Sequence, residues 1–278
     1  MSYRTVLQCL VATALPLTWA WGQATIRVSG TGTGVALMHL LAPQFEKEHP
    51  GLKLQVLPSI GSSGGIRAVA DGRLEIACTS RPLKPEEASK GLKEWPLART
   101  PFLFVAQKAN PVGGLSFEQV LRAHEGSLTA WPSGAPLRLV LRPKSDTAHA
   151  QLAGISKAME AALEKAHATP GAIIAMTDQD CADQLEKTPG SLGPLNLGLL
   201  LAERRQLKAL SLDGVEPSVD NLARGRYPHF TSILLISGGG KPSAALERLQ
   251  RFLSSPGAAK LLRSHGFLPE MPAKGGKG

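Results

Sequence analysis

The feature that most constrains this chain is a pair of glycine- and hydroxyl-rich turns, each lying between a strand-like run and a helix-like run. The first turn reads Ser-Gly-Thr-Gly-Thr-Gly at residues 29–34, and the second reads Gly-Ser-Ser-Gly-Gly at residues 61–65. Such turns let backbone N–H groups converge on one point, and the positive end of the following helix faces the same way. With the hydroxyls of Thr31 and Thr33 as further donors, the two turns predict an anion-binding cleft.

Apolar periodicity alternates between strand and helix along most of the chain. This alternation predicts an α/β fold with mostly parallel sheets and flanking helices, in which ligands bind beyond the carboxyl ends of the strands. The pattern predicts strands at 26–28, 52–57, 74–79, 102–106, 137–142, 207–212 and 232–237, and helices at 35–49, 85–90, 116–124, 147–165, 243–254 and 256–265. Both glycine turns follow predicted strands, where a ligand is expected.

Two further strand ends carry polar side chains. Ser80 follows the third predicted strand, and Arg142 ends the fifth. The segment after Arg142 opens a helix, with Ser145 as the expected N-cap and Thr147 in the first turn. A guanidinium presents a fixed fork of donors that suits a tetrahedral oxyanion. A surface salt bridge would explain Arg142 alone, but its position beside three hydroxyl-rich turns favours ligand binding.

The first residues are typical of a secretory signal peptide. Arg4 is the only charged side chain before Arg27, an apolar run covers residues 6–21, and small residues follow. We expect a signal peptide at residues 1–24 that directs the protein to the periplasm and is cleaved near its end. An uncleaved membrane anchor is the alternative.

The formal charge of +9 fits a small anionic ligand better than nucleic acid. Lysine and arginine are spread along the chain, and aromatic residues make up only 5% of it, which leaves few stacking platforms for bases. Export from the cytoplasm also argues against a nucleic-acid partner.

Two cysteines follow the predicted signal peptide, Cys78 and Cys181. They could form one disulfide in an oxidising compartment, although Cys78 lies in an apolar run where a buried free thiol is about as common. The glycine- and lysine-rich end at residues 272–278 is expected to be a flexible tail.

Several segments together resemble one known family. Their order and spacing are similar to those of the phosphate-binding proteins of bacterial ABC phosphate importers, which have a two-lobed type II periplasmic binding fold. The matching segments are the Gly-Thr-Gly-Thr turn, residues 45–51, the turn ending at Ile66, and residues 74–83, 110–112, 213–218 and 226–228. The resemblance covers most of residues 26–265.

The resemblance implies two lobes joined by two chain crossings, with lobe 1 formed by residues 25–105 and 228–271 and lobe 2 by residues 106–227. It implies capture of inorganic phosphate or a similar oxyanion between the lobes, followed by delivery to the membrane permease of an ABC importer. The protein is then a monomer that needs no cofactor and catalyses no reaction.

The resemblance also implies the ligand-binding residues. They are Thr31, Gly32 and Thr33 in the first turn, Ser62 and Ser63 in the second, Ser80, and Arg142, Ser145, Asp146 and Thr147 after the fifth strand. Asp146 stands where the family has a glycine, and the segment from Arg142 to Ser145 is one residue shorter than in the family. Ser80 occupies a position at which some members have an aspartate.

These departures bear on the choice of ligand. Phosphate near neutral pH carries a proton that sulfate lacks, so a site that prefers phosphate benefits from a hydrogen-bond acceptor. We hypothesise that Asp146 supplies this acceptor; the alternative is that it faces solvent at the start of a helix. Sulfate, molybdate and tungstate are alternative ligands, and a sensing or partner-binding role is an alternative to transport.

A serine hydrolase is the catalytic alternative. The second turn satisfies the pattern Gly-x-Ser-x-Gly, with Ser63 as the nucleophile. The acid and base of a triad would follow in the required chain order, from Asp178 or Asp180 and from His229 or His265. A proline separates this turn from its strand, whereas a nucleophile follows its strand directly in such enzymes. The histidines are scattered and form no metal-binding motif.

Overall fold

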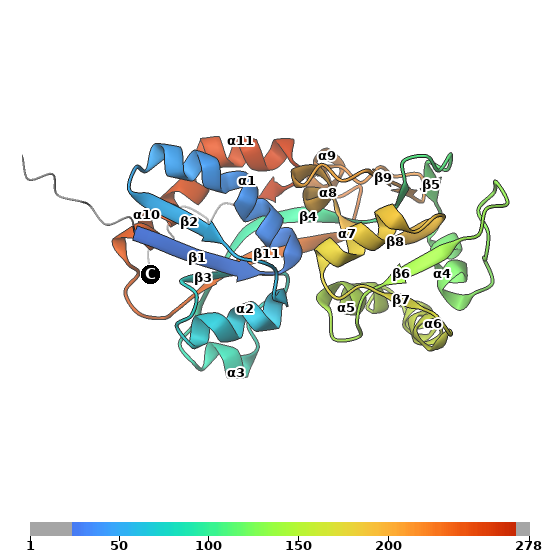
Figure 1. Ribbon diagram of the computed structural model, residues 1–278, viewed down its shortest axis with the longest axis horizontal. Helices are drawn as coiled ribbons and strands as arrows, with labels where there is room; N and C mark the ends of the chain where they lie inside the picture. Colours follow the sequence, from blue (N-terminus) through green and yellow to red (C-terminus); the bar gives the residue numbers. More distant parts are fainter. Residues whose placement is uncertain (1–23, 271–278) are drawn as a thin grey trace, which may run out of the picture.

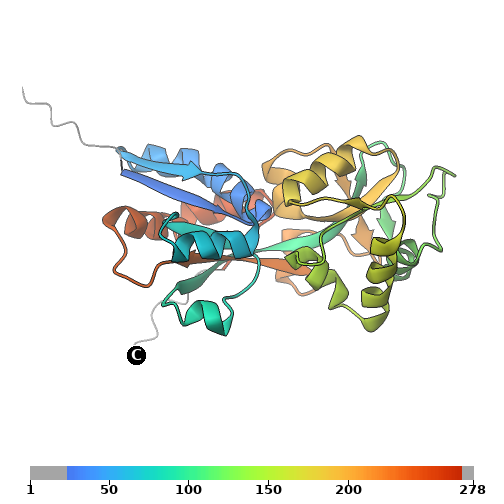
Figure 2. The same ribbon diagram turned by 60° about the horizontal axis from the view of Figure 1, so that its bottom comes forward.

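The computed structural model describes residues 24–270, which form two lobes joined by extended strands (Figure 1). The signal peptide expected at residues 1–24 lies outside this range except for Ala24, and the tail expected at residues 272–278 lies outside it entirely. The view in Figure 2 shows the same two lobes on either side of a shared middle. Within the described range, no helix has the length and apolar character needed to cross a bilayer.

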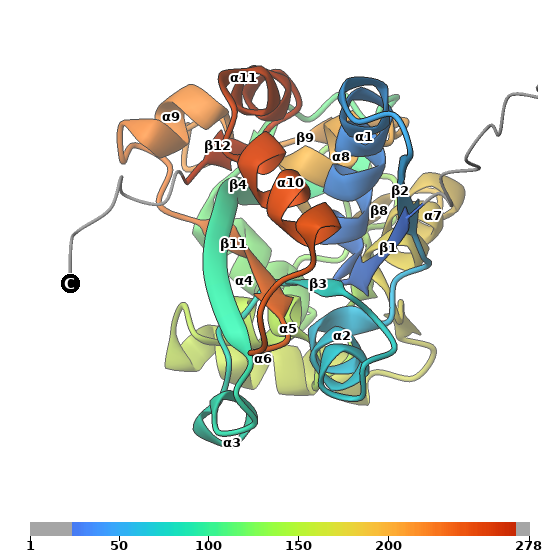
Figure 3. The same ribbon diagram turned by 90° about the vertical axis from the view of Figure 1, so that its left-hand side faces the viewer.

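Lobe 1 is built on a sheet whose parallel strands are extended by antiparallel ones. β1 (Ala24–Gly30) lies between β2 (Leu52–Val56) and β3 (Ile76–Thr79) and is parallel to both, and β11 (Phe230–Ser237) runs antiparallel to β3. The sheet is covered by α1 (Gly32–Glu48), α10 (Ala244–Leu253) and α11 (Pro256–Ser264) on one side and by α2 (Gly61–Ala70) on the other, with α3 (Pro85–Ala88) nearby (Figure 3).

A single long strand, β4 (Lys93–Gln107), belongs to the sheets of both lobes. It pairs antiparallel with β11 as far as Pro101, and from Phe102 onward it pairs with β8 (Ser191–Asn196) and β9 (Leu207–Ala209). The partner of β4 therefore changes between Pro101 and Phe102. The division expected at residue 105 stays a prediction.

Lobe 2 contains the second group of parallel strands. β6 (Arg138–Leu141) is parallel to β7 (Ile173–Ile174) and to β8. The helices of this lobe are α4 (Phe117–Glu125), α5 (Thr147–Ala153), α6 (Lys157–Ala168) and α7 (Asp178–Lys187). The remaining elements are β5 (Gly114–Leu115), α8 (Leu197–Ala202), β10 (Ser211–Leu212), α9 (Val219–Ala223) and β12 (Leu268–Pro269).

Separate apolar cores stabilise the two lobes, and the first turns of α1 reach the second core. Phe45 of α1 packs against Phe252 of α10 in lobe 1, with ring centroids 5.4 Å apart. Ala36, near the start of the same helix, packs with Cys181 and Leu199 from lobe 2. This packing places the amino end of α1 beside α7.

Three local expectations are wrong. The strand predicted at residues 207–212 is two strands, β9 and β10, which belong to different sheets. The helix predicted at residues 147–165 is two helices, α5 and α6, because Gly154 ends the first and Ser156 caps the second by accepting a hydrogen bond from the Met159 N–H. Ser145 is not the N-cap of α5; Asp146 is, and its carboxylate accepts a hydrogen bond from the Ala148 N–H at 2.9 Å.

The cysteine alternatives are resolved in favour of free thiols. Cys78 lies in β3 and Cys181 in α7, and both are buried and unpaired. Burial raises the pKa of the Cys181 thiol to about 12, so both cysteines act as small apolar core residues.

Candidate functional site

The first glycine turn brings the start of α1 against β3. The Thr31 N–H donates to the Cys78 carbonyl at 2.9 Å. Gly30 has a φ of 137°, and a Cβ at this position would collide with the Cys78 backbone. Glycine is therefore required for this close approach. The turn leaves the N–H groups at the amino end of a 17-residue helix facing the middle of the molecule.

The second glycine segment, predicted as a turn at residues 61–65, is instead the start of α2. The residues just before it bond to the first glycine turn, and Ser62 bonds to the end of β3. The Ser59 hydroxyl donates to the Gly30 carbonyl at 2.9 Å, and the Ile60 N–H donates to the same oxygen at 3.1 Å. The Ser62 hydroxyl accepts from the Ser80 N–H at 3.0 Å and lies 3.1 Å from the Ser80 hydroxyl. Three segments that are distant in sequence thus form one polar surface.

Arg142 comes from lobe 2, directly after β6, and its side chain is only 4% exposed. It donates to the Asp146 carboxylate at 2.9 and 3.3 Å and to the Ala175 carbonyl at 3.1 Å. Burial alone would lower the pKa of Arg142, but the nearby carboxylates of Asp178 and Asp146 outweigh it and raise the pKa above its ordinary value. The guanidinium is therefore a fixed positive charge in the site.

Asp178 is the residue that connects the two lobes. It begins α7 in lobe 2, yet its carboxylate accepts from the Thr33 N–H at 2.8 Å and from the Thr33 hydroxyl at 3.0 Å, both in lobe 1. The Thr31 hydroxyl donates to the same oxygen at 3.4 Å. The other carboxylate oxygen lies 3.2 Å from Arg142 Nη2. Asp178 thus accepts hydrogen bonds from Thr31 and Thr33 and pairs with Arg142, which are the donors expected from the sequence to bind an anion.

Asn196 makes a further contact between the lobes. This buried side chain, at the end of β8, donates through Nδ2 to the Thr33 hydroxyl at 2.9 Å. Its Oδ1 atom is buried without a hydrogen-bond partner. An acceptor in this state is available for a donor on a bound ligand.

A small pocket lies where these groups meet, with a volume of about 10 Å³. That volume is close to the minimum of roughly 10–15 Å³ that admits one water molecule. Its lining residues come from both lobes and are Thr31, Ser80, Asp146, Thr147, Ala148, Gln151, Asp178, Asn196 and Thr231.

A wider opening of about 600 Å³ lies next to the small pocket and also reaches both lobes. The sequence-predicted residues that line it are Ser62, Ser63, Ser145, Asp146 and Thr147. Arg67, Arg81, Lys84 and Lys144 also line it. Arg81 pairs with Glu87 and Lys144 pairs with Glu164. The positive charges of Arg67 and Lys84 are the ones left to attract small anions to the opening.

The structure places the sequence-predicted residues in the same region, some at the small pocket and others only at the wider opening. Thr31, Ser80, Asp146 and Thr147 line the small pocket, and Ser62 contacts Ser80. Arg142 does not line this pocket but pairs with Asp146 and Asp178, which do. Ser63 and Ser145 lie only at the wider opening. Gly32 and Thr33 face Asp178.

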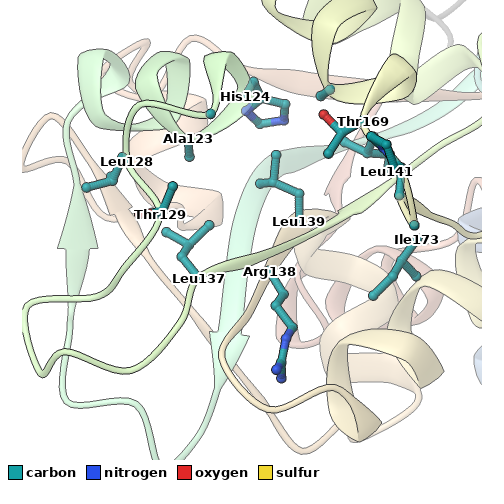
Figure 4. Close-up of a pocket in the computed structure, with 15 residues that line it drawn as sticks. Ala123, His124, Leu128, Thr129, Leu137, Arg138, Leu139, Leu141, Thr169 and Ile173 are labelled. Atoms are coloured by element: carbon teal, nitrogen blue, oxygen red, sulfur yellow. The ribbon is translucent and has the colours of Figure 1, made fainter.

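Another hollow, of about 340 Å³, lies far out in lobe 2 among α4, α6, β6 and β7. Its lining is largely apolar, with the buried ring of His124 on one side (Figure 4). The Arg138 side chain extends away from His124 and Leu139 (Figure 4) and donates to the Pro189 carbonyl at 3.0 Å. Because its only cationic side chain points away, this hollow is unsuited to an inorganic oxyanion.

The hydrolase constellation does not assemble around Ser63. The Ser63 hydroxyl accepts a hydrogen bond from Arg81 at 3.0 Å, and no histidine among residues 24–270 bonds to it. His265 lies at the end of α11 and contacts Ser264 and Leu261 instead. In the same part of the chain, no group of three or more His, Cys, Asp or Glu side chains is arranged to hold a metal ion.

Sequence reasoning missed the part that Asp178 and Asn196 play in this site. From the sequence, Asp178 is a candidate only for a hydrolase triad, and no role is expected for Asn196. Thr177, Asp178 and Asp180 do form a recognisable helix start, because Thr177 and Asp180 make a reciprocal capping box. That signal locates the start of α7 but not its contact with a helix almost 150 residues earlier.

The chain is similar to known proteins over most of its length. A family model described as a PBP superfamily domain matches residues 17–257. Protein SphX of Synechococcus elongatus is 26% identical over 91% of this chain and 79% of its own length. The phosphate-binding protein PstS of Bacillus subtilis is 24% identical over 88% of this chain and 80% of its own length.

Solved structures share the arrangement of lobes. A putative phosphate ABC transporter substrate-binding protein from Clostridium perfringens, with bound phosphate, matches with a TM-score of 0.74 at 21% identity, over 88% of this chain and 99% of its own. An ABC-type phosphate transport receptor from Vibrio cholerae matches with a TM-score of 0.62 at 23% identity, over 89% and 100%. These likenesses confirm the two-lobed α/β fold expected from the sequence.

Proposed function

The chain belongs to the PBP superfamily, and on that premise we propose that it is an exported, monomeric solute-binding protein that captures inorganic phosphate between its lobes and delivers it to the permease of an ABC importer. Curated relatives named as phosphate-binding proteins span most of its length. The observation that carries the proposal is that hydroxyls from both lobes line one pocket, next to the buried guanidinium of Arg142, which pairs with Asp146 of that pocket.

The donors available in the site account for binding of an oxyanion. Each hydrogen bond to a charged group contributes about 1.5–3 kcal/mol, and micromolar affinity requires about 8 kcal/mol in total. The hydroxyls of Ser80 and Thr147 line the small pocket. Thr31, the N–H groups at the start of α1 and Arg142 add further donors when Asp178 releases them, and together these groups are enough for this affinity. Closure of the lobes would then remove the ligand from water.

The acceptors in the site favour phosphate over sulfate. Asp146 lines the small pocket, and the Asn196 Oδ1 atom lacks a donor. A protonated phosphate can donate a hydrogen bond to either acceptor, whereas sulfate at neutral pH has no proton to donate and is repelled by the carboxylate. The ligand of this site is therefore expected to be the protonated oxyanion.

Isothermal titration calorimetry of the mature protein with phosphate, sulfate, molybdate and tungstate tests the proposal. We expect micromolar or tighter binding of phosphate and much weaker binding of the others. Tight binding of a different oxyanion would transfer the proposal to that ion, and no binding of any of the four would refute it. Incubation with a serine-reactive fluorophosphonate should leave Ser63 unlabelled, because the proposed function involves no covalent step.

A further inference from the structure

The donors at the start of α1 are already engaged by a carboxylate of the protein itself. Asp178 accepts from the N–H and hydroxyl of Thr33 and from the hydroxyl of Thr31, and it pairs with Arg142. Thr31, the N-cap residue of α1, makes no side-chain capping bond of its own, and the first turn of α1 holds no acidic residue. Asp178 therefore supplies, from the other lobe, the negative charge that a helix amino end favours.

The residue opposite Asp178 is shaped to admit it. A Cβ built on Gly32 would lie 2.6 Å from the Asp178 Cβ and would also overlap the Gln179 side-chain oxygen. The Gln179 amide donates to the Gly32 carbonyl at 3.0 Å, so α7 is held against this glycine by a second contact. Only the absence of a side chain at position 32 lets α7 come this close.

The arrangement leaves no space for an external oxyanion at the donors that Asp178 occupies. The pocket beside Asp178 has a volume of about 10 Å³, which is scarcely enough for one water molecule. Phosphate has five non-hydrogen atoms, so it can reach these donors only if Asp178 moves away. The guanidinium of Arg142 is also matched by two carboxylates, Asp146 and Asp178, so the three side chains together carry a net negative charge.

We propose that Asp178 is an internal competitor of the oxyanion: it occupies the donors of Thr31, Thr33 and Arg142 in the ligand-free protein, holds the lobes closed, and is displaced when the ligand binds. This inference rests on the proposed function for the identity of the ligand. The occupied and open forms exchange in the ligand-free protein, and phosphate binds the form in which the donors are free. The apparent affinity for phosphate is reduced by the fraction of molecules in which Asp178 is engaged.

Two measurements on purified mature protein test the proposal. Small-angle X-ray scattering without ligand reports how far the lobes are closed, and calorimetry reports the affinity for inorganic phosphate. In Asp178→Ala we expect a larger radius of gyration than in the wild type and phosphate affinity at least about tenfold higher, equivalent to about 1.4 kcal/mol. Asp183→Asn is the control on the same helix, because Asp183 pairs with Arg205 away from the site; it should match the wild type in both.

Two further variants separate the effect of the Asp178 contact with α1 from the effect of negative charge beside Arg142. Asp146→Asn also removes a negative charge beside Arg142, but the Asp146 carboxylate bonds to Arg142 and Ala148 and not to Thr31 or Thr33. The ligand-free protein should therefore keep its closed shape. Gly32→Ala keeps every charge and should expel Asp178 by steric overlap, so it should open the ligand-free protein. Gly32→Ala also keeps the proposal testable if Asp178→Ala does not fold.

The outcomes distinguish this inference from the proposed function. An unchanged radius of gyration in both Asp178→Ala and Gly32→Ala overturns it, and so does phosphate affinity in Asp178→Ala that is equal to or weaker than that of the wild type. Weaker binding would make Asp178 an acceptor for the ligand. If neither the wild type nor Asp178→Ala binds phosphate while both variants open, the proposed ligand is wrong and the interlobe contact of Asp178 is supported.

Discussion

The Ser62 hydroxyl accepts a hydrogen bond from the Ser80 N–H at 3.0 Å and lies 3.1 Å from the Ser80 hydroxyl. This pair joins the start of α2 to the end of β3 and orients the Ser80 hydroxyl at the small pocket, which Ser80 lines.

Replacement of Ser62 by alanine should therefore weaken phosphate binding. The variant loses a partner that holds Ser80, and we expect a decrease in affinity of roughly ten- to a hundredfold, the value of one hydrogen bond to a charged group. Calorimetry with inorganic phosphate measures the change. Ser127→Ala is the control, because Ser127 is exposed and bonds only to the Arg122 carbonyl. Wild-type affinity in Ser62→Ala would show that this pair has no part in binding.

Asp146 should set the preference between phosphate and sulfate. Asn caps helices about as well as Asp, so Asp146→Asn should fold normally while removing the carboxylate that repels sulfate. We expect the ratio of phosphate to sulfate affinity to fall at least tenfold, mainly through stronger sulfate binding. Competition calorimetry with both ions measures this ratio. If both affinities stay at their wild-type values, Asp146 is only a helix cap.

Arg142 should be essential for both folding stability and ligand binding. Arg142→Met leaves Asp146 and Asp178 without their shared cation, and loss of one partner of a buried ion pair costs about 3–5 kcal/mol. Urea denaturation measures this loss, and calorimetry should detect no phosphate binding. Combining Arg142→Met with Asp178→Asn should recover part of the stability, because one of the unpaired charges is removed.

A matched arginine on the surface serves as the control for that prediction. Arg73 lies 3.7 Å from the Asp71 carboxylate, and both side chains are largely exposed. Exposed pairs of this kind contribute about 0–1 kcal/mol, so Arg73→Met should unfold close to the wild type. A similar loss in Arg73→Met and Arg142→Met would contradict the importance assigned to burial.

Stability should fall as the solution becomes acidic because of a histidine pair in lobe 2. The rings of His149 and His167 lie 5.1 Å apart, and each has a buried nitrogen without a partner. Partial burial lowers the pKa of both rings below the ordinary 6.5, and the charge of the other histidine or of Lys144 lowers them further. Folding therefore favours the neutral rings, so this stability is complete above pH 6.5 and decreases as the pH falls through the lowered pKa values.

Urea denaturation at about pH 7.5 and about pH 5 measures this dependence. The double variant His149→Gln, His167→Gln should lose less stability between the two pH values than the wild type. His39→Gln is the control, because His39 is exposed on α1. An equal pH dependence in the wild type and the double variant would assign acid sensitivity to other groups.

The sequence predicted those parts of the site that depend on local structure. The glycine turns, Ser80 and Arg142 could be placed because each follows a strand, and strand ends converge in this class of fold. Their meeting at one interlobe region follows from the sheet order rather than from any single motif. Whether each of these residues binds the ligand stays a prediction.

The parts that sequence could not supply depend on tertiary contacts. The Asp178 carboxylate accepts hydrogen bonds from the start of α1 because the two lobes pack together, and no spacing along the chain encodes this contact.

The break between α5 and α6 is not visible in the apolar periodicity, which continues across Gly154. A glycine followed by Ser156 is nevertheless a common way to end one helix and start another. Ser145 is the N-cap expected from the sequence, but Asp146, one residue later, takes that position. Both residue types cap helices equally well.

The continuous course of β4 restricts how the molecule can rearrange. Because 15 consecutive residues form one ribbon through both sheets, sliding of one half past the other would tear a row of ladder hydrogen bonds. Torsion of the ribbon where its partner changes, between Pro101 and Phe102, breaks far fewer. The two halves should therefore rotate about one narrow axis that passes near this point of β4.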